Sequence, residues 1–284
     1  MLDAMPEGHT IHRAARLQGH AFAGRRLAVT SPQGRFTEGA AALDGRRLER
    51  IDAVGKHLLY RFEDAPALHV HLGLFGRFRL HEGDDPPTAS PQTRLELVAR
   101  PEGAAGAGRP AVTLRCSGPT ACELLTDAEE ATLRARLGPD PLDPAAGPAG
   151  FAAALSRRSA GIGQALLDQR AVAGVGNVYR AEALFLAGLH PDEPAAALGP
   201  DDVEALWATL RELLRTGERQ GRIVTITPAD RSRPPSRLRR DEAVYVYGRE
   251  GLPCRRCGAL IRSWPLGGRR VFACPDCQPP RPTG

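Results

Sequence analysis

The sequence predicts an α+β protein of several domains, because the residue pattern changes three times along its 284 residues. A helical segment is followed by short strand-like runs over residues 24–125, and from residue 138 onward apolar residues recur at helical spacing. The final segment carries two pairs of cysteines at the spacing of a zinc site. We therefore place the domain boundaries at 137/138 and 245/246, which gives domains 1–137, 138–245 and 246–284.

Composition excludes several classes of protein. Hydrophobic residues make up 42% of the chain and charged residues 25%, and its 31 glycines and 25 prolines stay below the level of a low-complexity chain. No apolar run approaches the roughly 18 residues that a membrane span needs, and the N-terminus lacks the regions of a secretory signal. We therefore expect a cytoplasmic protein that is not inserted in a membrane.

The N-terminal part is predicted to be a helix followed by strands. Residues 6–22 place Ile11, Ala15 and Phe22 at helical spacing. Strand-like runs follow at residues 25–30, 56–62, 68–72, 77–80, 95–98 and 112–114. Many short strands at this spacing are typical of a sandwich or a barrel. Residues 101–110, which are rich in Gly and Ala, are predicted to form a flexible loop.

The middle part is predicted to be helical. Residues 138–150 are rich in Gly and Pro and predict a linker. Helical spacing then predicts helices over residues 151–157, 164–170, 178–186 and 203–215. The Arg-, Pro- and Ser-rich residues 231–240 are predicted to be a loop.

The last part contains the motif Cys254-x-x-Cys257 followed by Cys274-x-x-Cys277, which matches a tetrahedral zinc site. A segment this short cannot hold a core by itself, so the metal supplies stability. Four sulfur ligands leave no position for a catalytic water, which makes the zinc structural. The remaining cysteines, Cys116 and Cys122, are interpreted as ordinary thiols.

Between the two cysteine pairs the sequence predicts a β-hairpin. Two strand-like runs flank Gly267-Gly268, a pair that favours a tight turn. Arg269 and Arg270 follow the turn directly, and guanidinium groups on a rigid hairpin suit contacts with phosphate. The alternative is a solvated tip without a partner.

A glycine-rich turn is a candidate anion site. Gly174-Val175-Gly176-Asn177 precedes a predicted helix, and its backbone N–H groups could bind an anion, although Asn177 could also be a simple helix cap.

Lys56 is the single lysine among the 38 lysines and arginines in a chain of net charge +5. Since lysine can donate a proton and arginine cannot, Lys56 is either a chance survivor or a functional residue.

These motifs together resemble the formamidopyrimidine-DNA glycosylase/endonuclease VIII family. The matching segments are Met5-Pro6-Glu7-Gly8, Gly55-Lys56-His57-Leu58, Leu166-Leu167-Asp168-Gln169, Gly174 to Glu182, and Val246 to Gly251 with the four cysteines. The Pro-Glu-Gly start is similar to the endonuclease VIII branch. The resemblance implies an N-terminal two-layer β-sandwich, a helix–two-turns–helix domain and a C-terminal zinc β-hairpin.

The resemblance also implies roles for individual residues. Pro6 would be the nucleophile that forms an iminium with the damaged nucleotide, and Glu7 would move protons at the sugar. Lys56 would contact phosphate and act as a general acid. Asn177 and Arg269 would hold phosphates around the extruded nucleotide, with Arg269 counted as part of the catalytic site. Leu74 and Phe75 match the position of the intercalating loop, or else are core side chains of a turn.

The activity implied is that of a bifunctional DNA glycosylase/AP lyase of base-excision repair. We expect a monomer with one structural Zn²⁺ that acts on damaged double-stranded DNA, removes oxidised pyrimidines and cleaves the strand by β,δ-elimination. One alternative is an oxidised-purine (formamidopyrimidine) glycosylase. The other is a non-catalytic binder of abasic DNA in which Pro6 is blocked.

The sequence departs from the family pattern at its start. Four residues precede Met5, and a proline inside a chain is an amide without a nucleophilic nitrogen. We therefore expect translation from Met5 or processing that exposes Pro6. In addition, His9-Thr10 stand where the family commonly has a second Pro-Glu.

Overall fold

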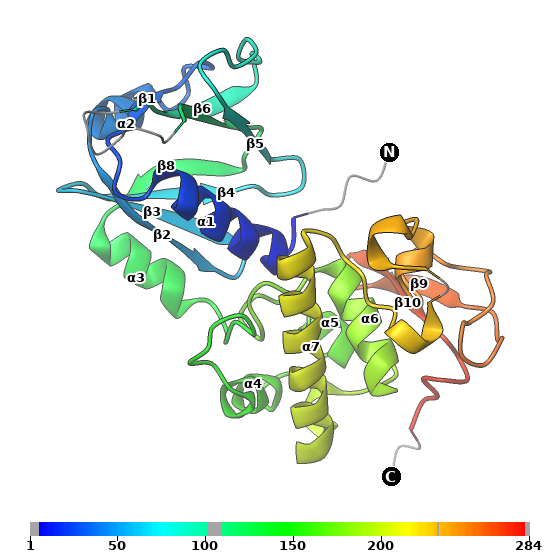
Figure 1. Ribbon diagram of the computed structural model, residues 1–284. Helices are drawn as coiled ribbons and strands as arrows, with labels where there is room; N and C mark the ends of the chain where they lie inside the picture. The colour runs from blue at the N-terminus through cyan, green and yellow to red at the C-terminus, as the bar shows by residue number, and fades with distance from the viewer. Residues whose placement is uncertain (1–5, 102–109, 232, 282–284) are drawn as a thin grey trace. The chain divides into compact units, whose positions relative to one another are not determined.

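The computed structural model describes residues 6–101, 110–231 and 233–281, and the chain divides into two compact units (Figure 1). The first unit contains Pro6 and residues 11–135, and the second contains residues 7–10 and the chain from residue 136 onward. The helical segment and the cysteine pairs therefore belong to one compact unit. Residues 102–109 of the loop predicted at 101–110 lie outside the described residues.

The first unit contains two four-stranded antiparallel sheets, with strand orders β1-β6-β7-β5 and β2-β3-β4-β8 (Figure 1). The bounds of the first sheet are β1 (Ala28–Thr30), β5 (Arg77–Glu82), β6 (Thr93–Ala99) and β7 (Val112–Ser117). Those of the second are β2 (Leu48–Val54), β3 (His57–Phe62), β4 (Ala67–His71) and β8 (Ala121–Leu125). Apolar residues of both sheets and of α1 (Gly8–Phe22) form one core. The structure thus confirms a β-sandwich with an N-terminal helix.

Alternation along the strands explains the two layers. In β6, buried residues alternate with half-buried ones, and Leu95 and Leu97 point into the core. In the facing sheet, Leu58, Leu68 and Val70 point into the same core. Each sheet therefore buries one face against the other, as a sandwich requires.

Sequence analysis missed β2, β8, α2 (Thr37–Leu43) and α3 (Asp127–Ala135). The case of α3 shows the reason, because its buried residue is Glu130 rather than an apolar side chain. Glu130 accepts hydrogen bonds from Arg61 on β3 and from Arg134. The bonds from Arg61 hold the pKa of Glu130 below its ordinary value. A helix attached by ion pairs leaves no apolar stripe in the sequence.

The second unit contains α4 (Pro148–Leu155), α5 (Ile162–Ala165), α6 (Asn177–Ala187) and α7 (Pro200–Gln220). Short 3₁₀ turns lie at Ala195–Ala197, Pro228–Asp230, Pro235–Arg237 and Asp241–Ala243. The prediction of a helix over residues 164–170 is wrong, because α5 ends at Ala165 and the Asp168 carboxylate accepts a hydrogen bond from the backbone N–H of Arg170. Among the described residues, no helix has both the length and the apolarity needed to cross a membrane.

The predicted linker over residues 138–150 is in part a packed segment. The backbone N–H of Gly138 donates to the carbonyl of Gln169, and the N–H of Ala173 donates to the carbonyl of Pro139. A Cβ atom on Gly138 would lie 2.6 Å from the carbonyl carbon of Ala171. The glycine that suggested flexibility is therefore needed for close approach of two backbones.

The C-terminal hairpin is confirmed. Strands β9 (Arg262–Leu266) and β10 (Arg269–Ala273) pair antiparallel and are joined by Gly267-Gly268. Both glycines have positive φ angles, 61° and 73°, as a two-residue hairpin turn requires. A separate apolar cluster includes Phe185 of α6, Tyr245 and Cys274, and so packs the cysteine-containing segment against α6.

Candidate active site and metal centre

The carboxylate of Glu7 lies at the N-terminus of α6 and is 1% exposed. It accepts hydrogen bonds from the backbone N–H groups of Gly176 (2.8 Å), Val178 (2.9 Å) and Tyr179 (3.4 Å). These N–H groups have no partner within the helix, and the helix dipole also favours a negative charge at this end. Glu7 is therefore held in a built anion site.

Glycines make this close contact possible. A Cβ atom on Gly176 would overlap the side chain of Glu7, and one on Gly8 would lie 2.9 Å from the Cα atom of Gly174. In addition, the N–H of Gly8 donates to the carbonyl of Gly174 at 2.8 Å. The anion-binding turn predicted at residues 174–177 is thus present, and the anion that occupies it is the chain's own Glu7.

The surroundings of Glu7 are closed to water. His9 is 4% exposed and meets the ring of Tyr179 edge to face, with 5.2 Å between the ring centroids. A Cβ atom on Gly217 of α7 would overlap the Tyr179 hydroxyl. Burial, and to a smaller extent the charge of Glu7, raise the pKa of Tyr179 above its ordinary value. The His9 that departs from the family pattern is therefore a packing residue in this chain.

Pro6 precedes this anchored carboxylate by one residue and is half-buried. The two residues that follow it, Glu7 and Gly8, are both fixed to the loop before α6.

Lys56 lies in the first unit, in the two-residue turn Gly55-Lys56 between β2 and β3. Gly55 has a φ of 58°, which suits such a turn. The residue after the turn, His57, pairs in register with His71 on β4. Lys56 is also close enough to His71 to contribute to lowering the pKa of that imidazole, after the larger effects of burial and of His69.

Leu74 and Phe75 are exposed and are not core residues. They are 47% and 85% exposed in the connection from β4 to β5, between Gly73 and Gly76. The N–H of Gly76 donates to the carbonyl of Leu72, and a Cβ atom on Gly73 would overlap Thr120. A tight loop therefore presents two large apolar side chains to solvent.

Asn177 is the first residue of α6 and does not cap it, because Gly176 is the N-cap. The Asn177 side-chain N–H donates to the carbonyl of Arg270, and its oxygen accepts from Arg180. Asn177 is 6% exposed. The simple capping role is thereby excluded, and Asn177 instead joins α6 to the hairpin.

Arg180 is a residue that sequence analysis passed over. It is fully buried and donates to the carbonyls of Leu266 and Arg270, at 3.1 and 2.9 Å, on the two strands of the hairpin. Burial, together with the nearby Arg269 guanidinium, lowers the pKa of Arg180 to about 10, so it stays charged at neutral pH. The sequence signal that could have identified Arg180 is its position in the motif Asn177-Val178-Tyr179-Arg180.

The two arginines after the hairpin turn have different surroundings. Arg270 donates to both carboxylate oxygens of Glu250, at 2.7 and 2.9 Å, and to the hydroxyl of Ser263. Arg269 has an exposed side chain at the first position of β10. Arg270 is therefore a structural residue of the hairpin, whereas the side chain of Arg269 is exposed.

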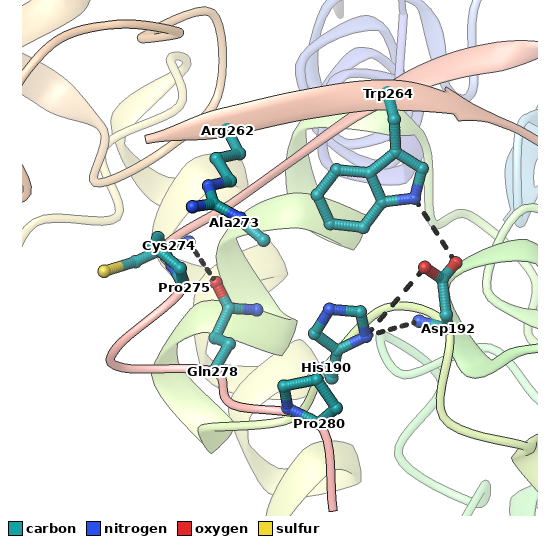
Figure 2. A pocket seen from close by; sticks show the side chains of 9 residues that line it. All are labelled: His190, Asp192, Arg262, Trp264, Ala273, Cys274, Pro275, Gln278 and Pro280. Atoms are coloured by element: carbon teal, nitrogen blue, oxygen red, sulfur yellow. Dashed lines mark hydrogen bonds and ion pairs between the residues drawn. The ribbon is translucent and has the colours of Figure 1, made fainter. Parts of the chain in front are cut away.

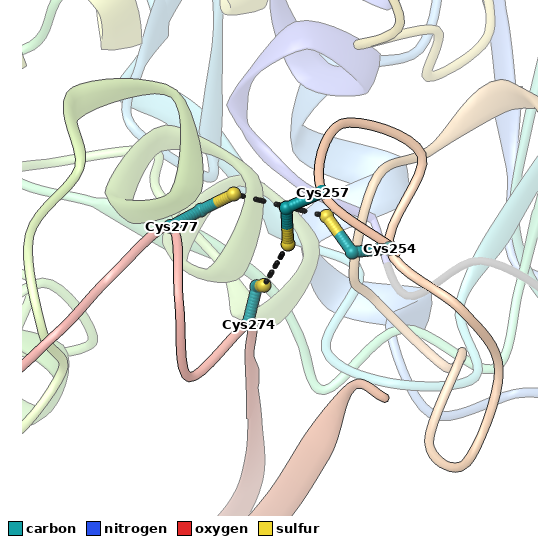
Figure 3. Close-up of side chains that lie close together, drawn as sticks. All are labelled: Cys254, Cys257, Cys274 and Cys277. Atoms are coloured by element: carbon teal, nitrogen blue, oxygen red, sulfur yellow. Dashed lines mark hydrogen bonds between the residues drawn. The ribbon is translucent and has the colours of Figure 1, made fainter. Parts of the chain in front are cut away.

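The four predicted cysteines converge at the base of the hairpin (Figure 3). Their sulfur atoms all lie within 4.8 Å of one another, with 3.9 Å between Cys254 and Cys277 and 3.4 Å between Cys257 and Cys274. Two sulfurs bound to one tetrahedral zinc at about 2.3 Å would lie roughly 3.8 Å apart. The arrangement fits a four-coordinate metal site.

A pocket of about 300 Å³ lies beside this cluster (Figure 2). His190 stacks on Trp264 of β9, with 5.6 Å between ring centroids, and the indole N–H donates to Asp192 at 3.3 Å. Gln278 donates to the carbonyl of Leu189. These contacts join the hairpin to the residues that follow α6, so the pocket wall also supports the metal site.

Glu182 is a second anchor that sequence analysis did not identify. It is fully buried and accepts hydrogen bonds from the backbone N–H groups of Tyr245, Val246 and Tyr247, at 2.7, 2.9 and 2.8 Å. The chain entering the cysteine segment is thus fixed to the same helix that holds Glu7. One helix, α6, positions both ends of the candidate site in this unit.

Comparison with known proteins gives two matching family models. Residues 5–107 match the formamidopyrimidine-DNA glycosylase N-terminal domain, and residues 137–227 match the formamidopyrimidine-DNA glycosylase H2TH domain. Endonuclease 8 1 of Mycobacterium tuberculosis is 44% identical over 278 residues, which cover 96% of this chain and 100% of that protein. The formamidopyrimidine-DNA glycosylase of Thermus thermophilus is 37% identical over 246 residues, or 84% of this chain and 85% of the relative.

Solved structures show the same fold. The MutM (Fpg) protein from Thermus thermophilus has a TM-score of 0.73 and 32% identity, covering 98% of this chain and 100% of that chain. Lactococcus lactis Fpg, in a complex with DNA containing N7-benzyl-Fapy-dG, has a TM-score of 0.75 and 25% identity, covering 97% and 100%.

The fold, the matched domains and the relatives define a DNA glycosylase of base-excision repair. The chain belongs to the formamidopyrimidine-DNA glycosylase/endonuclease VIII family, whose members are DNA glycosylases with AP lyase activity.

Replacing Arg180 should loosen the hairpin. An Arg180→Lys variant keeps the charge but cannot donate to both strands, so buried carbonyls lose their partners. We expect the free energy of unfolding to fall by about 2–4 kcal/mol in urea titrations. Arg262→Lys, on the exposed side of β9, is the matched control and should change it by less than about 0.5 kcal/mol. Equal stabilities of the two variants would contradict this role for Arg180.

Proposed function

We propose that the chain is a bifunctional glycosylase/AP lyase that acts as a monomer on damaged double-stranded DNA and removes oxidised pyrimidines through Pro6. The observation that carries this proposal is the Glu7 carboxylate, buried on the N-terminus of α6 and adjacent to Pro6 in the chain. A fixed carboxylate next to a secondary amine is the arrangement that iminium chemistry at a sugar carbon needs.

In the proposed reaction residues 1–5 are absent, and the free secondary amine of Pro6 forms a bond to the anomeric carbon as the glycosidic bond breaks. The electron pair of that bond leaves with the damaged base, which takes up a proton. Glu7 accepts and returns protons at the sugar as the ring opens and the iminium forms. Loss of a C2′ proton then expels the 3′ phosphate, and a second elimination expels the 5′ phosphate.

Lys56 assists these eliminations as a phosphate contact and general acid. Lys56 lies in a tight turn between β2 and β3, so the backbone from which its side chain extends is held in place by the paired strands. As the only lysine, it is also the one side chain among the 38 lysines and arginines that can act as a proton donor. These two properties support a functional role over chance survival.

The extruded nucleotide must be held, because flipping a base costs a few kcal/mol. We propose that Arg269 and Asn177 hold the flanking phosphates, and that Leu74 and Phe75 fill the space that the base leaves. The exposure of Arg269, Leu74 and Phe75 supports these roles. For Asn177, the support is its position between α6 and β10.

Two observations bear on the lesion. The relative named Endonuclease 8 1 matches at 44% identity over its whole length, which favours the endonuclease VIII branch and oxidised pyrimidines. The second candidate is removal of oxidised purines, which the match to formamidopyrimidine-DNA glycosylase of Thermus thermophilus favours.

We also propose that the four cysteines bind one structural Zn²⁺. Sulfur donors at these separations suit zinc, and all four coordination positions are then filled by protein. The metal would hold the base of the hairpin that carries Arg269, without taking part in the chemistry.

Trapping tests the role of Pro6. With borohydride and a duplex that contains an abasic site, a chain that begins at Pro6 should give a covalent adduct, because its secondary amine forms a reducible iminium. A chain that retains residues 1–5 is the matched control and should give none. Adducts of equal yield from both chains would exclude Pro6 as the nucleophile. Absence of an adduct together with intact DNA binding would favour the non-catalytic binder.

Base release tests the lesion class. On duplexes that differ only in the damaged base, we expect kcat/KM for an oxidised pyrimidine to exceed that for an oxidised purine by about tenfold, or roughly 1.4 kcal/mol in the transition state. The measurement is single-turnover release of the base. A preference in the opposite direction would establish the oxidised-purine alternative.

Metal analysis tests the zinc proposal. We expect about one zinc per chain in the purified protein and a large loss of zinc in Cys274→Ser, since a missing ligand opens the site. Cys122→Ala removes a thiol of the first unit and should leave the zinc content unchanged. Full zinc retention in Cys274→Ser would show that the cluster does not bind the metal.

A further inference from the structure

A row of ionisable side chains lies on the outer face of the sheet β2-β3-β4-β8, next to Lys56. Leu58, Val70 and Cys122 of this sheet point into the core. Since neighbouring residues of a strand point to opposite faces, the residues between them point away from the core. These outward residues are His57 on β3, His69 and His71 on β4, and Glu123 on β8.

Two hydrogen bonds join three of these groups in series. His69 Nδ1 lies 3.0 Å from a carboxylate oxygen of Glu123, and His69 Nε2 lies 2.9 Å from His57 Nδ1. A carboxylate can only accept, so Nδ1 of His69 carries the proton that it donates. In neutral His69, Nε2 is then the acceptor, and His57 donates from Nδ1. Both hydrogen bonds therefore have the same direction, because His57 donates to His69 and His69 donates to Glu123.

The series continues to the lysine through ring contacts. His57 stacks on His69 with 5.1 Å between ring centroids and lies 4.7 Å from the ring of His71. The positive charge of Lys56 contributes to lowering the pKa of His71. The adjoining imidazoles of His69, His57 and His71 therefore lie between Glu123 and the end of β3 that Lys56 precedes, all within the first unit.

Other charged side chains of this sheet form ion pairs with one another. Arg61 of β3 donates to Asp52 of β2 at 3.1 Å and to Glu130 of α3. That group is an internally paired set, whereas among the described residues Glu123 contacts His69 and the charge of Lys56 acts on His71.

We propose that Glu123, His69 and His57 are positioning residues, forming a directional relay that orients His71 and stores one proton beside Lys56. The inference rests on the proposed function, in which Lys56 assists strand cleavage as a general acid. The negative charge of Glu123 offsets the repulsion that an added proton would meet from the Lys56 ammonium. Without that charge, we expect strand cleavage to lose its rate at a lower pH than in the wild-type chain.

The test is the pH profile of strand cleavage by Glu123→Gln. Glu123 is 55% exposed, so this change should leave the fold intact. We expect the single-turnover cleavage rate on an abasic duplex to fall about five- to tenfold at pH 7 and to recover toward the wild-type value near pH 6. This corresponds to a shift of the alkaline limb by about one pH unit. Affinity for a non-cleavable abasic duplex should change less than about twofold.

The matched control is Glu96→Gln, the same chemical change in an ion pair with Arg115 on the other sheet. It should leave the pH profile in place. A loss in Glu123→Gln that is equal at every pH would indicate a merely structural role and overturn the relay. An unchanged profile would overturn it as well.

Imidazole ¹⁵N NMR of the whole chain tests the relay without relying on activity. His69 should show a protonated Nδ1 and an acceptor Nε2, and Glu123→Gln should alter the shifts of both His69 and His57. The opposite tautomer of His69 would overturn the proposal. Failure of Pro6 trapping in the otherwise unaltered chain that begins at Pro6 would instead count against the proposed function, so the two failures can be distinguished.

Discussion

The contact between the Glu7 carboxylate and the N-terminus of α6 is the interaction on which the candidate site depends. Three backbone N–H groups that a helix cannot satisfy by itself find their acceptor in a side chain from the start of the protein. Removing a charge from water is costly unless hydrogen bonds replace the water, and here they do. The same bonds fix Glu7, the residue that follows the proposed nucleophile in the chain.

Helix α6 organises the rest of the second unit in a similar way. It is buried on all sides from Asn177 to Phe185. Its polar side chains form hydrogen bonds with other segments of the chain. Arg180 holds both strands of the hairpin, and Glu182 holds the backbone that enters the cysteine segment. A buried charge of each sign is tolerated because each is surrounded by backbone partners of the opposite polarity. The cysteine cluster, the hairpin and Glu7 thus share one support in the second unit.

The sequence was informative where a residue type has few uses. Four cysteines in two pairs, and two glycines between strands, allow few other structures, and the structure has both features. It was less informative where partners lie far apart in the chain. Helix α3 is attached by Glu130 to Arg61, a contact between residues 69 positions apart, and the Gly138 segment is packed although its composition suggests a linker. The local residue pattern of a segment contains no information about such long-range contacts.

From the sequence alone, one could determine the class of fold, the cysteine cluster, the hairpin and the residue types available for chemistry, because spacing and turn preference are local properties. Tertiary structure alone decided that the anion at the start of α6 is Glu7, that Leu74 and Phe75 are exposed, and that Arg180 rather than Arg270 joins the hairpin to the helix. It also aligned Glu123, His69 and His57 across three strands. The physical reason is that burial and hydrogen-bond partners depend on which distant segments meet, and strand register and helix packing determine that.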